Sequence, residues 1–160
     1  MKEARATLGR VLCLPSERTQ FETKYLRKVN RLATLFFALH VPAFVAVAYF
    51  NDTGPGTALL LTLAVLVGPL LATASFKNPR HVSLVHGFTG MLMGGLLVHF
   101  GQGPVQIEMP FYFFALLAML AVFANPLVLL VAAGTVTVHH VALWYSLPAP
   151  VFHPAPPLSA

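Results

Sequence analysis

Histidine is the residue type with the widest chemical range in this 160-residue chain, which contains seven of them. Five lie inside or at the ends of long apolar stretches, and the one acid close to them is Glu108; the five are His40, His86, His99, His139 and His140. Neutral imidazole is an axial ligand of haem iron and a common ligand of copper and zinc. Because a polar side chain in an apolar stretch needs a partner or a function, these residues are the candidates for a site.

Two kinds of cofactor site could use this set. Two histidines on different helices, drawn from His40, His99, His139 and His140, could hold haem b axially. Alternatively, a copper or zinc ion could be bound by His99, Glu108, His139 and His140. A third interpretation needs no cofactor, because histidines also form hydrogen bonds between membrane helices.

The segments that carry these residues are markedly apolar. The chain is 57% hydrophobic and only 9% charged, whereas soluble domains carry about a quarter charged residues. A soluble fold of this size could not cover its surface with so few charges, but lipid tolerates an apolar exterior. The composition therefore predicts an all-α integral membrane bundle.

Five segments have about the 20 residues that cross roughly 30 Å of hydrocarbon. The expected spans are 32–50, 57–75, 81–100, 105–124 and 126–145. A basic arm at 1–16 and an amphipathic interfacial helix at 17–31 precede them, and a proline-rich tail at 147–160 follows. Residues 17–31 could instead be a charged extension of the first span. We expect about five spans (four to five), and a re-entrant hairpin over the last two is the alternative.

The basic residues predict the orientation of this bundle. Eight of the ten lie in the first 31 positions, and Lys77 and Arg80 belong to the turn between the second and third spans. Since cytoplasmic loops carry the excess of Lys and Arg, the N-terminus and this turn are expected in the cytoplasm. The same distribution argues against nucleic-acid binding.

In this topology His99, Glu108 and the pair His139–His140 share one level near the outer end, and His40 lies a turn or two deeper. Neighbouring residues on a helix point about 100° apart, so His139 and His140 cannot face one small centre equally well. We expect one of them to bind and the other to form a hydrogen bond.

Gly90 and Gly94 form a small-residue spacing in the third span that lets helices approach closely. Packing within the chain is favoured over a dimer seam. The sequence has no glycine-rich phosphate loop, no paired carboxylates and no Ser/His/Asp arrangement, and its single cysteine, Cys13, excludes an internal disulfide. A role as an enzyme is therefore not favoured.

Several short stretches resemble a known family: FETKYLRKVNR at 21–31, LHVP at 39–42, LVHFGQG at 97–103, IEM at 107–109, and the pair His139–His140. The family is the multi-span N-terminal membrane sensor domain of some bacterial methyl-accepting chemotaxis proteins, histidine kinases and diguanylate cyclases. The resemblance implies a multi-pass protein of the bacterial inner membrane, a sensory role and dimerisation through an output domain. It also implies that the polar signature positions are His40, His99, Glu108, His139 and His140.

This chain departs from the family at two points. Pro110 stands where the family has a histidine, which would weaken a metal site and perturb the start of the fourth span. Relatives also continue past the position of Phe152 into another span and a cytoplasmic output domain. The expectation is that this chain is either a truncated or stand-alone version or signals through a separate partner chain.

The sequence thus predicts a membrane-embedded sensory input domain that binds haem b through outer-half histidines and signals by helix repacking. One alternative is a b-type cytochrome for electron transfer. The others are a copper- or zinc-binding membrane protein and a cofactor-free structural or partner-binding module. Expected partners are membrane lipid, a second copy of the chain and an output protein, but not nucleic acid.

Overall fold

The computed structural model describes residues 19–102 and 108–146, and all regular structure in these ranges is helical. The elements are α2 (Gln20–Ala38), α3 (His40–Phe50), α4 (Pro55–Ser75), α5 (Pro79–Phe100), α6 (Phe111–Leu120), the 3₁₀ helix η2 (Ala121–Phe123) and α7 (Pro126–Ser146). The arm expected at 1–16, the start of the fourth span at 105–107 and the tail at 147–160 lie outside the described residues.

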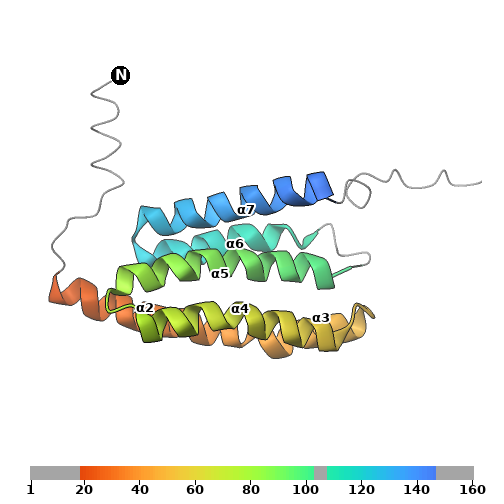
Figure 1. Ribbon diagram of the computed structural model, residues 1–160, viewed down its shortest axis with the longest axis horizontal. Coiled ribbons are helices and arrows are strands. Elements are labelled where there is room, and N and C mark those ends of the chain that lie inside the picture. The colour runs from red at the N-terminus through yellow and green to blue at the C-terminus, as the bar shows by residue number, and fades with distance from the viewer. Residues whose placement is uncertain (1–18, 103–107, 147–160) are drawn as a thin grey trace, which may run out of the picture.

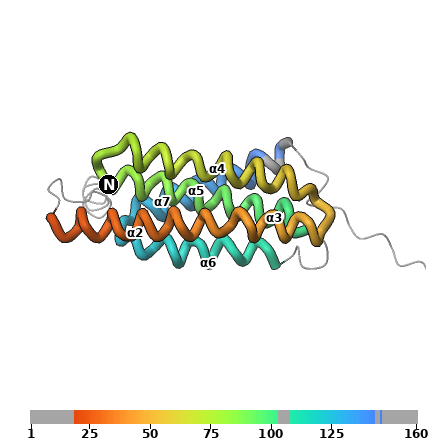
Figure 2. Tube along the Cα trace, turned by 90° about the horizontal axis from the view of Figure 1, so that it is seen from below, coloured from red at the N-terminus to blue at the C-terminus, as the bar shows by residue number. Residues whose placement is uncertain are grey.

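The helices lie side by side along the length of the molecule and alternate in direction (Figures 1 and 2). α2 and α3 follow one another end to end and act as a single rod. α5 contacts α2, α3, α4, α6 and α7, so it is the central helix of the bundle. The all-α expectation is confirmed for the described part of the chain.

Three helical segments are long enough and apolar enough to cross a membrane: Gln20–Phe50, Pro55–Ser75 and Pro79–Phe100. Phe111–Phe123 and Pro126–Ala142 are shorter apolar helices. Large apolar side chains are exposed on the outside of the bundle, among them Leu60, Leu71, Phe114, Leu130 and Val138. An apolar exterior of this kind suits lipid rather than water.

The first long helix begins earlier than the expected span. Thr19 caps α2 by accepting the Glu22 backbone N–H at 3.0 Å. The buried residues Leu26, Asn30, Ala33 and Phe37 then follow at helical spacing, straight across the boundary expected at residue 31. Residues 20–31 therefore extend the first helix and are not a separate element, because one buried face runs through both parts.

Two prolines explain where helices stop and start. Pro42 has no N–H to donate to the carbonyl of Ala38, and α2 ends at Ala38. Pro110 is the N-cap of α6, where a missing N–H costs nothing. Together α6 and η2 span roughly 20 Å, which is shorter than the fourth span expected at 105–124.

Glycines let other helices approach α5. A Cβ atom at Gly87 would lie 2.7 Å from the backbone oxygen of Val128, and one at Gly94 would lie 2.6 Å from the ring of Phe113. Gly90 is also buried inside the chain's own bundle. These contacts fix the register of α6 and α7 on α5, and so position the side chains described next.

Candidate functional site

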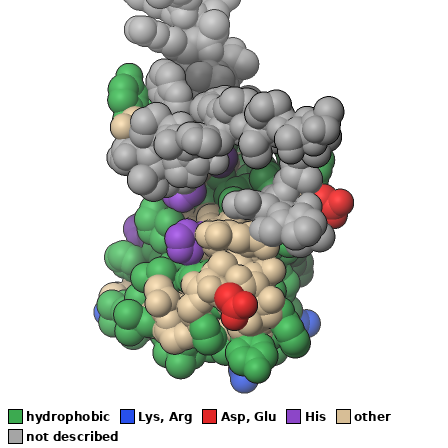
Figure 3. Space-filling model, turned by 90° about the vertical axis from the view of Figure 1, so that its right-hand side faces the viewer, with side chains coloured by type: hydrophobic (Ala, Val, Ile, Leu, Met, Phe, Trp, Pro, Cys, Tyr) green, Lys and Arg blue, Asp and Glu red, His purple; other side chains and the backbone are tan. Residues whose placement is uncertain are grey.

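Charge is separated between the two ends of the bundle. Every Lys and Arg of the described residues lies at the end where α2 and α5 begin: Lys24, Arg27, Lys28, Arg31, Lys77 and Arg80. There Arg80 donates to Glu22 from Nε and Nη2, at 2.5 and 2.8 Å. Asp52 and Glu108 occupy the opposite end, where histidine side chains also gather (Figure 3).

His40 is buried at the start of α3, and both of its ring nitrogens are in use. Its Nδ1 lies 2.9 Å from the carbonyl oxygen of Phe36. A carbonyl can only accept, so Nδ1 carries the proton and Nε2 is the acceptor. Nε2 accepts from the hydroxyl of Tyr112 on α6 at 2.6 Å. This bond joins the first rod to α6.

His86 is fully buried on α5. Its Nδ1 donates to the carbonyl of Val82 at 2.9 Å, and its Nε2 lies 2.9 Å from Oγ1 of Thr34 on α2. His86 therefore contacts α2 through its side chain, and it lies apart from the outer-half residues.

The remaining predicted site residues lie further out. His99 and Glu108 are exposed. The ring of His139 packs on Gly95, and its Nδ1 is buried without a hydrogen-bond partner in the described part of the chain. His140 is exposed and donates from Nδ1 to the carbonyl of Val136 at 2.9 Å.

Contacts along α5 show how these residues are layered. Phe113 lies against Gly94, and its ring centroid is 5.8 Å from that of His140. Tyr112, which binds His40, precedes Phe113 on α6 and points about 100° away from it. His40 therefore lies close to the level of the histidine pair but on a different side of α6.

The described residues do not assemble a metal centre. No three His, Cys, Asp or Glu side chains among them are close enough to hold an ion, so His99, Glu108, His139 and His140 are not gathered. His40 could reach haem iron through Nε2 only by giving up Tyr112. No histidine lines any of four cavities that the described residues form.

The described residues therefore bring no set of three ligands together for copper or zinc, and they do not test whether haem b binds. The binding of haem b, copper or zinc stays a prediction. Absorption spectra of the oxidised and the dithionite-reduced protein would test for haem, and metal analysis of the same sample would test for copper or zinc. A Soret band that shifts on reduction would support haem and with it the sensor or cytochrome alternatives.

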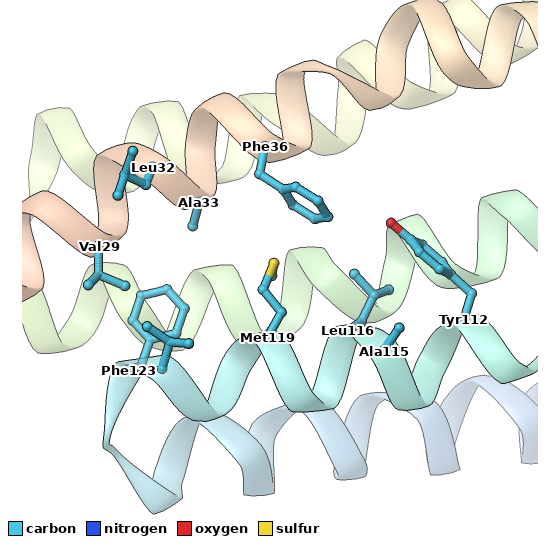
Figure 4. Close-up of a pocket in the computed structure, with 10 residues that line it drawn as sticks. Val29, Leu32, Ala33, Phe36, Tyr112, Ala115, Leu116, Met119 and Phe123 are labelled. Atoms are coloured by element: carbon cyan, nitrogen blue, oxygen red, sulfur yellow. The ribbon is translucent and has the colours of Figure 1, made fainter.

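The clearest site is instead an apolar cavity of about 540 Å³ between α2 and α6. Figure 4 shows α2 and α6 facing each other across it, with Phe36 and Tyr112 directed toward one another. Leu32 and Val122 belong to its wall and are more than half exposed, so the cavity opens at the side of the bundle. Its lining is Val29, Leu32, Ala33, Phe36, Tyr112, Ala115, Leu116, Met119, Val122 and Phe123.

Two tyrosine hydrogen bonds tie α2 and α3 to α6 and η2 at the ends of this cavity. One is the bond from Tyr112 to His40, and the other runs from the hydroxyl of Tyr25 to the carbonyl of Val122 at 2.7 Å. Neither tyrosine was predicted as a site residue from the sequence. The available signal was the phenolic hydroxyl, which needs a partner when the ring is buried.

The fold and the site together define an antiparallel, all-helical bundle with membrane-length apolar helices and a lateral cavity. No protein-family model, no curated protein and no solved structure matches the chain.

Proposed function

We propose that this chain is a membrane-embedded sensory input module that takes a small apolar ligand from the lipid into the cavity between α2 and α6. The observation that carries the proposal is that this cavity opens sideways and that the Tyr112–His40 hydrogen bond lies at its edge. The sequence resemblance to bacterial membrane sensor domains supports the sensory part.

The placement in the membrane is part of the proposal. Three membrane-length apolar helices and the exposed apolar side chains support a membrane bundle. That it has about five spans and lies in the bacterial inner membrane belongs to the proposal. The gathering of Lys and Arg at one end supports a cytoplasmic N-terminus. The cavity then faces the acyl chains, so its ligand enters from lipid rather than from water.

The chemistry of the lining defines the class of ligand. The hydroxyl of Tyr112 is the one side-chain polar group in the wall, and the other nine side chains are apolar. A lipophilic molecule with a carbonyl group fits this surface, because its oxygen can accept the hydrogen bond that the Tyr112 hydroxyl otherwise donates to His40. Binding would then break the bond between α3 and α6.

Loss of that bond would change how the first rod packs on α6. The other end of the cavity is held by Tyr25, one turn from Glu22 and its ion pair with Arg80. A shift of α2 is therefore transmitted to the charged end, where an output protein or a second copy could sense it. Two arrangements of this interface with nearly equal free energy would make the switch.

Two alanines on α6 allow a matched test. Ala115 lines the cavity, whereas Ala118 is exposed and does not. We expect native mass spectrometry of the detergent-purified protein to show a co-purifying apolar molecule that Ala115→Phe loses and Ala118→Phe keeps. Spin labels at Gln20 and Ala121 should report a changed distance distribution in Ala115→Phe only.

Either of two results would overturn the proposal. The first is that wild type and both variants carry the same bulk phospholipid and nothing else. The second is that the spin-label distances are identical in all three proteins, which would leave a cofactor-free structural or partner-binding module.

A further inference from the structure

A second cavity, of about 630 Å³, lies between α2, the end of α4 and the start of α5. Its wall combines three cations with apolar and hydroxyl side chains: Arg27, Asn30, Arg31, Thr34, Leu35, Leu70, Thr73, Ala74, Phe76, Lys77, Pro79 and Val82. No acidic residue belongs to this wall, so its charge is positive. We propose that this cavity binds an anionic phospholipid, with the phosphate at its mouth.

The wall changes from cationic to apolar in the same direction on two helices. On α2, Arg27 and Arg31 come first, and Leu35 lies about 12 Å beyond Arg27 along the helix axis. On α4, which runs the opposite way, Leu70 comes first and Lys77 follows the helix end. Charge at one end of the cavity and exposed apolar side chains further along both helices match a phosphate head followed by an acyl chain.

The polar side chains of the wall are already paired, except for the cations. Asn30 donates from Nδ2 to the carbonyl of Pro79 at 3.0 Å, and the Thr73 hydroxyl donates to the carbonyl of Pro69 at 2.8 Å. Arg27, Arg31 and Lys77 make no ion pair within the described residues. The donors left for a ligand are therefore two guanidinium groups and one ammonium group.

The location also favours a lipid over a soluble anion. The cavity lies at the charged end, where the proposed orientation places the cytoplasmic surface of the membrane. Basic pockets between membrane helices on that side suit phospholipid head groups. The inference rests on that orientation but not on the ligand of the α2–α6 cavity.

The test compares two double variants of α2 with the same change in charge. All four residues are exposed, but Arg27→Gln/Arg31→Gln removes two cations that line the cavity, whereas Lys24→Gln/Lys28→Gln removes two that do not. Phosphatidylglycerol binding to the full chain is measured by native mass spectrometry in zwitterionic detergent. We expect a loss of affinity of about tenfold or more in the first variant and less than about twofold in the second.

Equal losses in the two variants, or equal binding of phosphatidylcholine with the same acyl chains, would overturn the inference. Displacement of phosphatidylglycerol by millimolar inorganic phosphate would mean that the site takes a free anion, which also contradicts it. If the arginine variant fails to fold, Leu70→Trp should block the acyl part of the cavity without a change in charge. Leu71→Trp is its control, because Leu71 is exposed and outside the wall.

Discussion

His40 and His139 carry the same imidazole but differ in what their ring nitrogens contact. Both nitrogens of His40 form hydrogen bonds, whereas Nδ1 of His139 is buried without a partner among the described residues. A buried polar atom contributes to stability only when it is paired. The two residues should therefore respond differently to the same substitution.

We predict that His40→Leu lowers the free energy of unfolding by about 1–2 kcal/mol and that His139→Leu changes it by less than about 0.5 kcal/mol. In a double-mutant cycle, His40→Leu and Tyr112→Phe should couple by roughly 0.5–1.5 kcal/mol, because they remove the same bond. Unfolding of the detergent-solubilised protein with dodecyl sulfate measures both. Strictly additive effects would contradict the assigned hydrogen bond.

At this scale the sequence identified the residues but not their partners. The histidines stood out because they are polar groups in apolar segments. Tyr112 lies 72 residues from His40, and nothing in either segment indicates that they meet. The pairing follows from the register of α6 on α5, which depends on contacts such as Phe113 against Gly94.

Among the elements, α5 determines the packing of the others. Its glycines meet different neighbours: Gly87 faces the backbone of Val128, whereas Gly94 faces the ring of Phe113. A side chain can rotate away from an added methyl group, but a helix backbone can only move as a whole. The contact at Gly87 is therefore the least tolerant of added volume.

We predict that Gly87→Ala destabilises the bundle by about 1–3 kcal/mol, because the new Cβ would overlap the Val128 carbonyl. Gly134→Ala is the control, since a Cβ at Gly134 meets nothing within 4 Å. That change should be neutral or stabilise by up to about 1 kcal/mol through helix propensity. Similar thermal unfolding temperatures for the two variants would mean that α7 does not pack on α5 at Gly87.

Apolar length was sufficient to predict most helices, and the span expected at 126–145 begins where α7 begins. Two features of the elements were not predictable in the same way. Residues 20–31 have both a charged exposed side and a buried side, and their pattern fits an interfacial helix as well as an extension of the first span. The late start of α6 depends on Pro110 at the helix end, where proline is favoured rather than disruptive.

For the whole molecule, the decisive property is the separation of charge between the ends. Arg and Lys of the described residues surround the start of α2 and the turn before α5, and the acids Asp52 and Glu108 lie at the other end. Because cytoplasmic loops of membrane proteins carry the excess of Lys and Arg, such a bundle would have its cationic end in the cytoplasm. The first rod, α4 and α5 would then cross the membrane three times between residues 20 and 102.

This arrangement predicts opposite exposure of Gln20 and Gln102, two uncharged and exposed residues on either side of those three crossings. In a background where Cys13→Ser removes the only native cysteine, Gln102→Cys should react with a membrane-impermeant maleimide in intact bacterial cells. Gln20→Cys should react only after the inner membrane is permeabilised. The Cys13→Ser background without a new cysteine gives the unlabelled control. Labelling of both positions from the outside would contradict the three crossings. Labelling of Gln20→Cys alone would mean that the orientation is the reverse of the proposed one. Arg27, Arg31 and Lys77 would then meet an anionic lipid only on the outer side of the membrane.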